Sequence, residues 1–67
     1  MIQITVNGAA RRLERSLPVS LLIEQMALSG RKIAVERNGE IVPRGVHHQV
    51  LVQNGDRLEI VVAVGGG

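Results

Sequence analysis

The amino-acid sequence predicts an α+β domain in which one mixed sheet of four to five strands packs its apolar face against one main helix. Three observations support this fold class. Short segments alternate apolar and polar residues as half-buried strands do, two Asn-Gly pairs stand between such segments, and one segment has the apolar spacing of an amphipathic helix.

A hairpin is predicted at the N-terminus. Residues 2–6 alternate apolar and polar side chains, which indicates a strand with one buried face. Asn7 and Gly8 are the residue types that best tolerate the positive φ angles of a type I′ turn. Residues 9–15 are therefore expected to return as a second strand, and their thin apolar content is typical of a sheet edge.

An amphipathic helix is predicted to follow from Pro18. Its apolar stripe, at the spacing of one helix face, consists of Val19, Leu22, Ile23, Met26 and Ala27. Pro18 fits the first helical turn, where a missing N–H needs no partner, and Gly30 fits the left-handed position that commonly closes a helix. We therefore expect a helix of about three turns.

A second, shorter hairpin is predicted after the helix. Residues 33–37 have the composition of a strand, and Asn38 and Gly39 repeat the turn signal before a short strand at residues 40–42. Pro43 ends this strand, as an edge strand allows because its N–H groups need no partner.

The last part of the domain is predicted as a loop followed by the central strand. Val46, Val50 and Leu51 are expected to anchor residues 44–53 to the core. Residues 57–64 are apolar on one face and partly apolar on the other, which is typical of a central strand. This order of elements is the β-grasp arrangement in outline, and in it the final strand lies parallel to the first.

Composition excludes several classes of function. The chain has 67 residues and no cysteine, which excludes disulfide scaffolds, zinc ribbons and thiol nucleophiles. A net charge of +2 with scattered basic residues and no aromatic residue argues against nucleic-acid binding. No apolar run approaches the roughly 20 residues of a membrane helix, and no signal-peptide core is evident. We therefore expect no membrane contact and a cytoplasmic location.

The polar residues do not assemble a catalytic or metal site. His47 and His48 are adjacent and lack a third ligand, so they are interpreted as solvated loop residues. Asp56 follows Asn54 and Gly55 and is interpreted as a turn residue. No nucleophile and base, paired carboxylates or phosphate-binding loop is found, so we assign no catalytic residue, no metal and no bound cofactor.

The C-terminal glycines carry the functional hypothesis. Residues 1–64 are predicted to form the domain, and residues 65–67, all glycine, a flexible tail that could thread a narrow cleft of another protein. A carboxylate resists nucleophilic attack, but ATP converts it to an electrophilic acyl-adenylate. The C-terminus itself would then be the reagent, with a frayed end as the alternative.

The sequence resembles the ThiS family, the sulfur carriers of thiamine biosynthesis, over essentially the whole chain. The resemblance rests on residues 38–44, on Leu51 with residues 55–60, and on residues 64–67. It implies a ubiquitin-like β-grasp fold. It further implies that Gly67 carries the sulfur as a thiocarboxylate, while Gly65 and Gly66 thread the partner's active site.

The resemblance also implies the partners. A ubiquitin-activating-type (ThiF-like) adenylyltransferase would consume ATP, a cysteine-derived donor would supply sulfur, and a ThiG-like thiazole synthase would receive it. Two departures stand out. One is the additional Gly65, and the other is the segment Ser16-Leu17-Pro18-Val19, where the family more often has a threonine before the valine to cap the helix.

Partner contacts are predicted at Val61 and Ala63, which form an apolar strip on the open face of the sheet, and at Arg44 beside the edge strand. Three alternatives stay open at this point. The chain could serve another sulfur pathway as a molybdopterin-type carrier, act as a ubiquitin-like protein modifier, or be a passive interaction module with incidental glycines.

Overall fold

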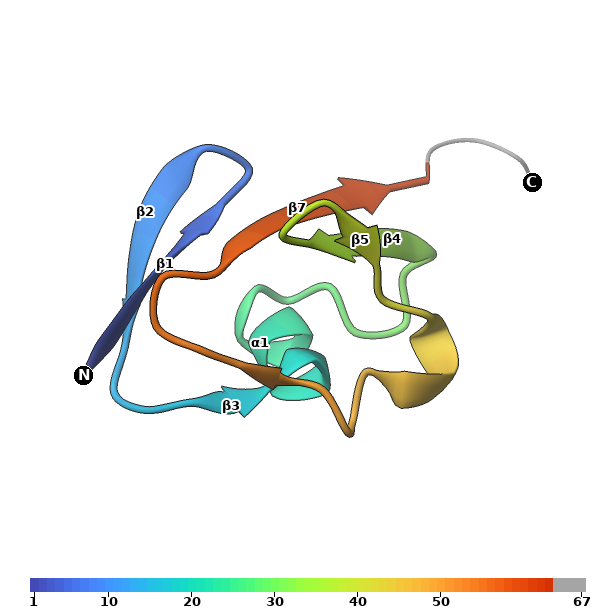
Figure 1. The fold of residues 1–67 in the computed structure, drawn as a ribbon. Coiled ribbons are helices and arrows are strands. Elements are labelled where there is room, and N and C mark those ends of the chain that lie inside the picture. The colour runs from blue at the N-terminus through green and yellow to red at the C-terminus, as the bar shows by residue number, and fades with distance from the viewer. Residues whose placement is uncertain (64–67) are drawn as a thin grey trace.

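The computed structural model describes residues 1–63. The elements in chain order are β1 (Ile2–Val6), β2 (Ala9–Leu13), β3 (Leu17–Pro18), α1 (Val19–Gln25), β4 (Ile33–Arg37), β5 (Glu40–Ile41), the 3₁₀-helix η1 (Arg44–Val46), β6 (Leu51–Val52) and β7 (Arg57–Val62). Figure 1 shows α1 lying across one face of the sheet, with the chain leaving at the end of β7.

The main sheet has five strands in the order β2-β1-β7-β4-β5. β1 and β7 are parallel, whereas the other neighbouring pairs are antiparallel. The predicted β-grasp arrangement is therefore confirmed, with β7 central and β2 and β5 at the edges (Figure 1). A second, two-stranded sheet pairs β3 with β6.

The core lies between the sheet and α1. Its six most deeply buried large side chains come from β1, α1, β4, β6 and β7, and they are Ile4, Val19, Leu22, Val35, Val52 and Leu58. Because buried and exposed residues alternate along β7 and in the second half of β1, the opposite face of the sheet is left open to solvent.

Both predicted hairpin turns are confirmed. Asn7 and Gly8 have φ angles of 51° and 84°, and Asn38 and Gly39 have 52° and 86°, as type I′ turns require. β2 is shorter than predicted and ends at Leu13, because Leu13 pairs with Ile2, the first residue of β1, and no partner remains beyond it.

The helix is shorter than the predicted three turns, since α1 has seven residues, about two turns. It ends at Gln25 with Met26 as the C-cap residue, and Ala27 follows with a left-handed φ of 59°. The Ala27 N–H donates to the Glu24 carbonyl at 2.9 Å, and the Leu28 N–H donates to the Ile23 carbonyl at 3.0 Å, which together form a Schellman motif. The prediction that Gly30 closes the helix was wrong. Leu28 packs against the core, and the chain therefore leaves the helical conformation before Gly30.

The helix N-terminus is supported by backbone carbonyls. Pro18 is the N-cap residue, one position before the predicted first turn, and it makes no side-chain capping bond. The Val19 N–H donates to the Val50 carbonyl at 2.9 Å, and the Ser20 N–H donates to the His47 carbonyl at 3.0 Å. The loop before β6 thus replaces the capping side chain that the sequence lacks.

The segment formed by that loop and β6 contains two residues whose burial was mispredicted. Leu51 is 46% exposed, and its neighbour Val52 is fully buried, because β6 turns Val52 toward the core. His47 is buried rather than solvated, and its Nε2 lies 3.0 Å from the Val42 carbonyl oxygen. Val46 and Val50 pack against the core as predicted.

Candidate functional site

The predicted sulfur-carrying end, Gly65, Gly66 and Gly67, lies outside the described residues, as does Val64. The described chain reaches Ala63, directly after β7. The structure therefore defines the surface from which the C-terminus departs.

The end of β7 presents its side chains on two faces. Leu58 and Ile60 point into the core, whereas Val61 is 62% exposed and Ala63 is also exposed. The placement of Val61 and Ala63 on the open face agrees with the predicted alternation. Their part in binding a partner stays a prediction.

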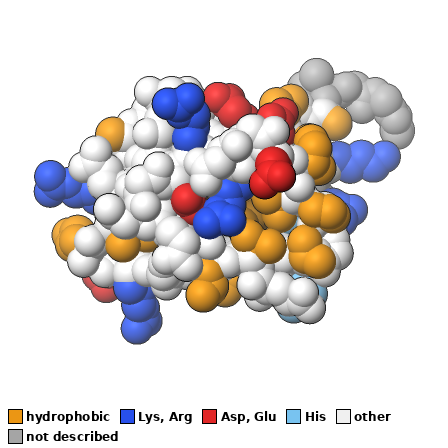
Figure 2. Space-filling model, in the orientation of Figure 1, with side chains coloured by type: hydrophobic (Ala, Val, Ile, Leu, Met, Phe, Trp, Pro, Cys, Tyr) orange, Lys and Arg blue, Asp and Glu red, His pale blue; other side chains and the backbone are white. Residues whose placement is uncertain are grey.

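A shallow groove joins β7 to β4 on this surface. Val61 is paired with Ala34, and the Ala63 N–H donates to the Lys32 carbonyl at 2.8 Å, which brings the two strands side by side. The residues lining the groove are Lys32, Ile33, Ala34, Arg44, Val61 and Ala63. Figure 2 shows hydrophobic side chains gathered on this side of the molecule, with basic side chains beside them.

Arg44 reaches the groove from η1, so the structure brings together all three predicted partner-contact residues. Its Nη2 donates to the Arg31 carbonyl at 3.2 Å, which holds the guanidinium near the loop before β4. Arg44 and Lys32 place two positive charges beside an apolar floor. Such a surface is complementary to an apolar side chain flanked by carboxylates.

Three groove residues, Lys32, Ile33 and Ala34, were missed by the sequence reasoning. Ala34 lies on the outward face of β4 by simple alternation, but its position opposite Val61 depends on the register between β4 and β7. Residue spacing along one strand predicts which face a side chain occupies, and it carries no information about the cross-strand partner.

Comparison with known proteins identifies the family. Residues 4–67 match the sequence profile of the ThiS family. The chain belongs to the ThiS family. The resemblance to the sulfur carriers of thiamine biosynthesis is thereby confirmed for nearly the entire chain.

Solved structures and relatives agree with this membership. The crystal structure of a thiamine biosynthesis protein (ThiS) from Geobacter metallireducens is 30% identical, has a TM-score of 0.84 and is matched over 98% of this chain and 100% of that chain. An uncharacterized protein ycf40 of Porphyra purpurea is 29% identical over 98% of this chain and 93% of its own length.

A longer relative is the thiazole synthase of Paramagnetospirillum magneticum, which is 44% identical over 66 residues. The match covers 98% of this chain and 20% of that protein. A thiazole synthase of Magnetococcus marinus shows the same coverage at 33% identity. The ThiS-family chain thus spans about a fifth of the length of these two relatives.

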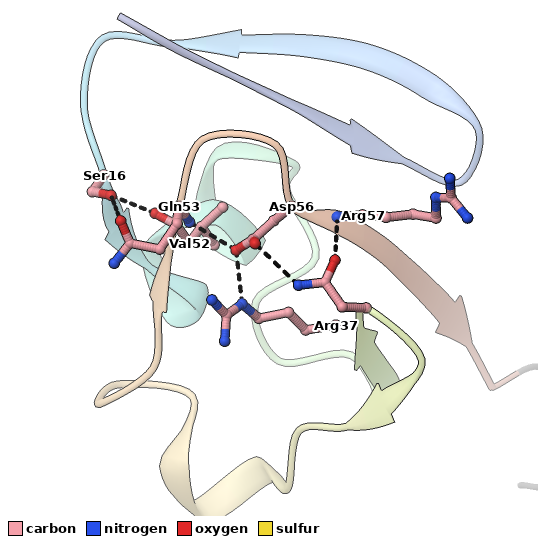
Figure 3. A network of polar contacts seen from close by, with 7 residues as sticks. Ser16, Arg37, Val52, Gln53, Asp56 and Arg57 are labelled. Carbon is pink, nitrogen blue, oxygen red and sulfur yellow. Dashed lines mark hydrogen bonds and ion pairs between the residues drawn. The ribbon is translucent and has the colours of Figure 1, made fainter.

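Asp56 in this ThiS-family chain serves turns, as predicted. Its carboxylate accepts hydrogen bonds from Arg37 Nε at 2.7 Å, the Gln53 N–H at 2.8 Å and Asn38 Nδ2 at 3.1 Å (Figure 3). Burial alone would raise the pKa of Asp56, but the hydrogen bonds from Arg37, Gln53 and Asn38 and the Arg37 charge outweigh it and lower the pKa.

Residues 1–63 of this ThiS-family chain contain no group of three or more His, Cys, Asp or Glu side chains placed to hold a metal ion. Within the same part of the chain, no helix is long and apolar enough to cross a membrane.

Proposed function

We propose that this protein carries sulfur on its C-terminal Gly67 for the synthesis of the thiazole moiety of thiamine. The observation that carries the proposal is the ThiS-family match, which extends to the last residue, Gly67. In this proposal the predicted domain, residues 1–64, is the part that a partner binds, and Gly65 and Gly66 lead the terminal carboxylate into the partner's active site.

The proposed chemistry begins with activation. A carboxylate oxygen of Gly67 attacks the α-phosphorus of ATP, pyrophosphate leaves, and an acyl-adenylate forms. Cysteine-derived sulfur at the oxidation level of sulfide then attacks the carbonyl carbon, and AMP leaves with the bonding electrons. The product is a C-terminal thiocarboxylate, and no electron transfer is required.

The chain contributes the reacting group, and its partner contributes the catalysis. Because the sequence has no cysteine, no thiol of this chain can bind the sulfur, which stays on the terminal carbonyl carbon. The partner for the first step is an adenylyltransferase of the ubiquitin-activating type, which binds the ATP. We therefore propose a carrier that acts as a co-substrate.

The groove between β4 and β7 is the proposed docking surface for the partners. Val61 and Ala63 supply apolar area next to the departing C-terminus, and Arg44 supplies a charge that steers an acidic partner. A side chain of the partner that enters this groove would hold the carrier within reach of the active site.

A thiazole synthase is the proposed recipient of the sulfur. Support comes from the Paramagnetospirillum magneticum and Magnetococcus marinus thiazole synthases, in which one polypeptide includes a segment similar to 98% of this chain. A carrier-like segment joined to a thiazole synthase is expected if the two act on each other, because linkage raises their effective concentration.

The first step is tested by ATP–pyrophosphate exchange. The purified chain, mixed with a ThiF-like adenylyltransferase from the same organism, should stimulate exchange of labelled pyrophosphate into ATP. A chain ending at Gly66 should not, because its carboxylate falls one residue short. Equal stimulation by both chains would overturn the proposal, and isopeptide-linked adducts of Gly67 in a lysate would favour a protein modifier.

A further inference from the structure

The parallel pairing of β1 with β7 stops well before the end of β7. It joins Thr5 to Arg57 and Val6 to Leu58, after which β1 turns away at Asn7 and Gly8. The last backbone bond of this ladder runs from the Asn7 N–H to the Leu58 carbonyl at 2.9 Å. The second half of β7 therefore lies beyond the backbone of β1.

The side chain of Asn7 continues the ladder where the backbone cannot. Its Oδ1 accepts from the Ile60 N–H at 2.7 Å, and its Nδ2 donates to the Ile60 carbonyl at 3.0 Å. One amide side chain thus satisfies both backbone groups of Ile60, as a further residue of a neighbouring strand would.

We propose that Asn7 is a positioning residue, which fixes the end of β7 and so the point from which the C-terminus departs. That Asn7 holds β7 is argued from its hydrogen bonds to Ile60. The effect on the reaction at the C-terminus rests on the proposed function. Asparagine suits the role because it tolerates a φ of 51° and carries both an acceptor and a donor. Aspartate lacks the donor, and glycine lacks both groups.

The effect on the C-terminus depends on how many residues separate the fixed part of β7 from Gly67. Four residues follow Ala63 in the sequence, and eight follow Glu59. Opening of β7 from Ile60 onward would double the segment that separates the sheet from Gly67. It would also lower the effective concentration of the carboxylate at a docked active site by about threefold.

A second turn of the same type provides a matched control. Asn38 also has a positive φ, of 52°, and its side chain also bonds to the backbone of β7, accepting from the Arg57 N–H at 2.9 Å. Asn38 holds the beginning of β7, whereas Asn7 holds its second half. Asn7→Gly and Asn38→Gly therefore create similar Gly-Gly turns and each remove side-chain hydrogen bonds, at opposite ends of the strand.

Amide hydrogen exchange of the full chain distinguishes the two variants. The readouts are the Ala63 N–H, which donates to the carbonyl of Lys32 just before β4, and the Val61 N–H, whose residue is paired with Ala34 of β4. In Asn7→Gly we expect both to exchange about tenfold faster, as the loss of two hydrogen bonds predicts. In Asn38→Gly the exchange of these two amides should change only as much as that of amides throughout the core, because the hydrogen bond to β7 that is lost in that variant is at the beginning of the strand.

The second readout is the kcat/KM of the adenylyltransferase for each chain, which should fall for Asn7→Gly, by up to about threefold when β7 is open in most molecules, and stay close to wild type for Asn38→Gly. Equal exchange of Val61 and Ala63 in the two variants, or faster exchange with unchanged kcat/KM, would overturn the positioning role. Absence of adenylation with the wild-type chain would instead overturn the proposed function, and exchange would still decide how β7 is held. Should Asn7→Gly not fold, Asn7→Asp keeps the turn and the acceptor and should give a smaller increase in exchange.

Discussion

Asp56 connects, through hydrogen bonds, two turns that are distant in the sequence. Its carboxylate is buried and receives hydrogen bonds from Arg37 and Asn38 of one hairpin and from Gln53 of its own turn. Because the β5 hairpin and the loop before β7 meet at this single group, its charge contributes to the stability of both.

Asp56→Asn is expected to lower the free energy of unfolding by about 2 kcal/mol at pH 7, since the charged partner of Arg37 is lost. The native pKa of Asp56 lies below its ordinary value of 3.8, so the stabilisation is fully present above that pH. It is lost as the pH falls through the native pKa.

Urea denaturation at pH 7 and at acidic pH measures this effect. The gap in stability between wild type and Asp56→Asn should narrow as the pH falls below about 3.8. Glu59→Gln, which changes an exposed carboxylate on β7, is the control and should differ little from wild type at either pH. A gap that does not change with pH would show that the charge of Asp56 is not what stabilises the turns.

Ala27 holds a left-handed backbone conformation that disfavours a residue with a Cβ atom. Ala27→Gly should therefore stabilise the protein by about 0.5–1 kcal/mol, which corresponds to a rise of a few degrees in Tm. Ala10→Gly, in the exposed β2, should lower Tm instead, because glycine weakens a strand. Calorimetry of the two variants checks this, and a lower Tm for Ala27→Gly would contradict the capping geometry.

At the scale of single residues, the sequence predicted whatever depends on local conformation. The positive φ angles of Asn7 and Asn38 were predictable because Asn-Gly, as a two-residue connection between strands, favours a type I′ turn. The burial of His47 was not, because it depends on the Val42 carbonyl being brought within 3.0 Å by the fold. The burial of Leu51 was mispredicted, since Leu51 and Val52 are adjacent apolar residues and show no alternation that would tell which one faces the core.

At the scale of elements, strand boundaries were predicted better than helix boundaries. β4 has its predicted bounds, and β5, predicted over residues 40–42, ends one residue early at Ile41; the turn at Asn38 and Gly39 that separates them is a local signal. The end of α1 depends on tertiary packing, because Leu28 joins the core and leaves Ala27 in a left-handed conformation. Gly30 is a better residue for that position by propensity, but the core determines where the chain turns.

The groove formed by β4 and β7 can be tested by a charge placed on its floor. Ala63→Glu should weaken binding of the adenylyltransferase at least tenfold, because the carboxylate is desolvated against an apolar partner. Ala10→Glu introduces the same side chain on an exposed position of the edge strand β2, and it should leave affinity unchanged. Isothermal titration calorimetry gives both affinities.

Circular dichroism should show that both glutamate variants are folded, since both positions are exposed. Equal affinities for Ala63→Glu and Ala10→Glu would remove the groove as a docking surface. They would leave the chemistry proposed for Gly67 untouched, because that chemistry needs the terminus and not a particular docking surface.

At the scale of the whole molecule, the topology places the first and the last strand side by side. β1 and β7 are parallel neighbours, although Thr5 and Arg57 are far apart along the chain. The strand order followed from analogy with the β-grasp arrangement, because no local pattern specifies a parallel partner. The groove could not be predicted as a unit, since it requires the register of β4 against β7 and the path of η1.

The molecule as a whole is proposed to present one reactive group that it cannot itself activate. Its core is filled by aliphatic side chains, and its buried polar groups, His47 and Asp56, make hydrogen bonds within the fold. The described residues thus provide a stable support and a groove, and the proposed reaction takes place at the last residue of the sequence.

Intact-mass spectrometry tests this claim most directly. The purified chain would be incubated with a ThiF-like adenylyltransferase, ATP and a cysteine-derived sulfur donor, in parallel with a chain that ends at Gly66. The full-length chain should gain the mass difference between one sulfur and one oxygen atom, located in its C-terminal peptide, and the shortened chain should keep its mass. An unchanged mass of the full-length chain, under conditions that convert an established carrier, would contradict the proposal.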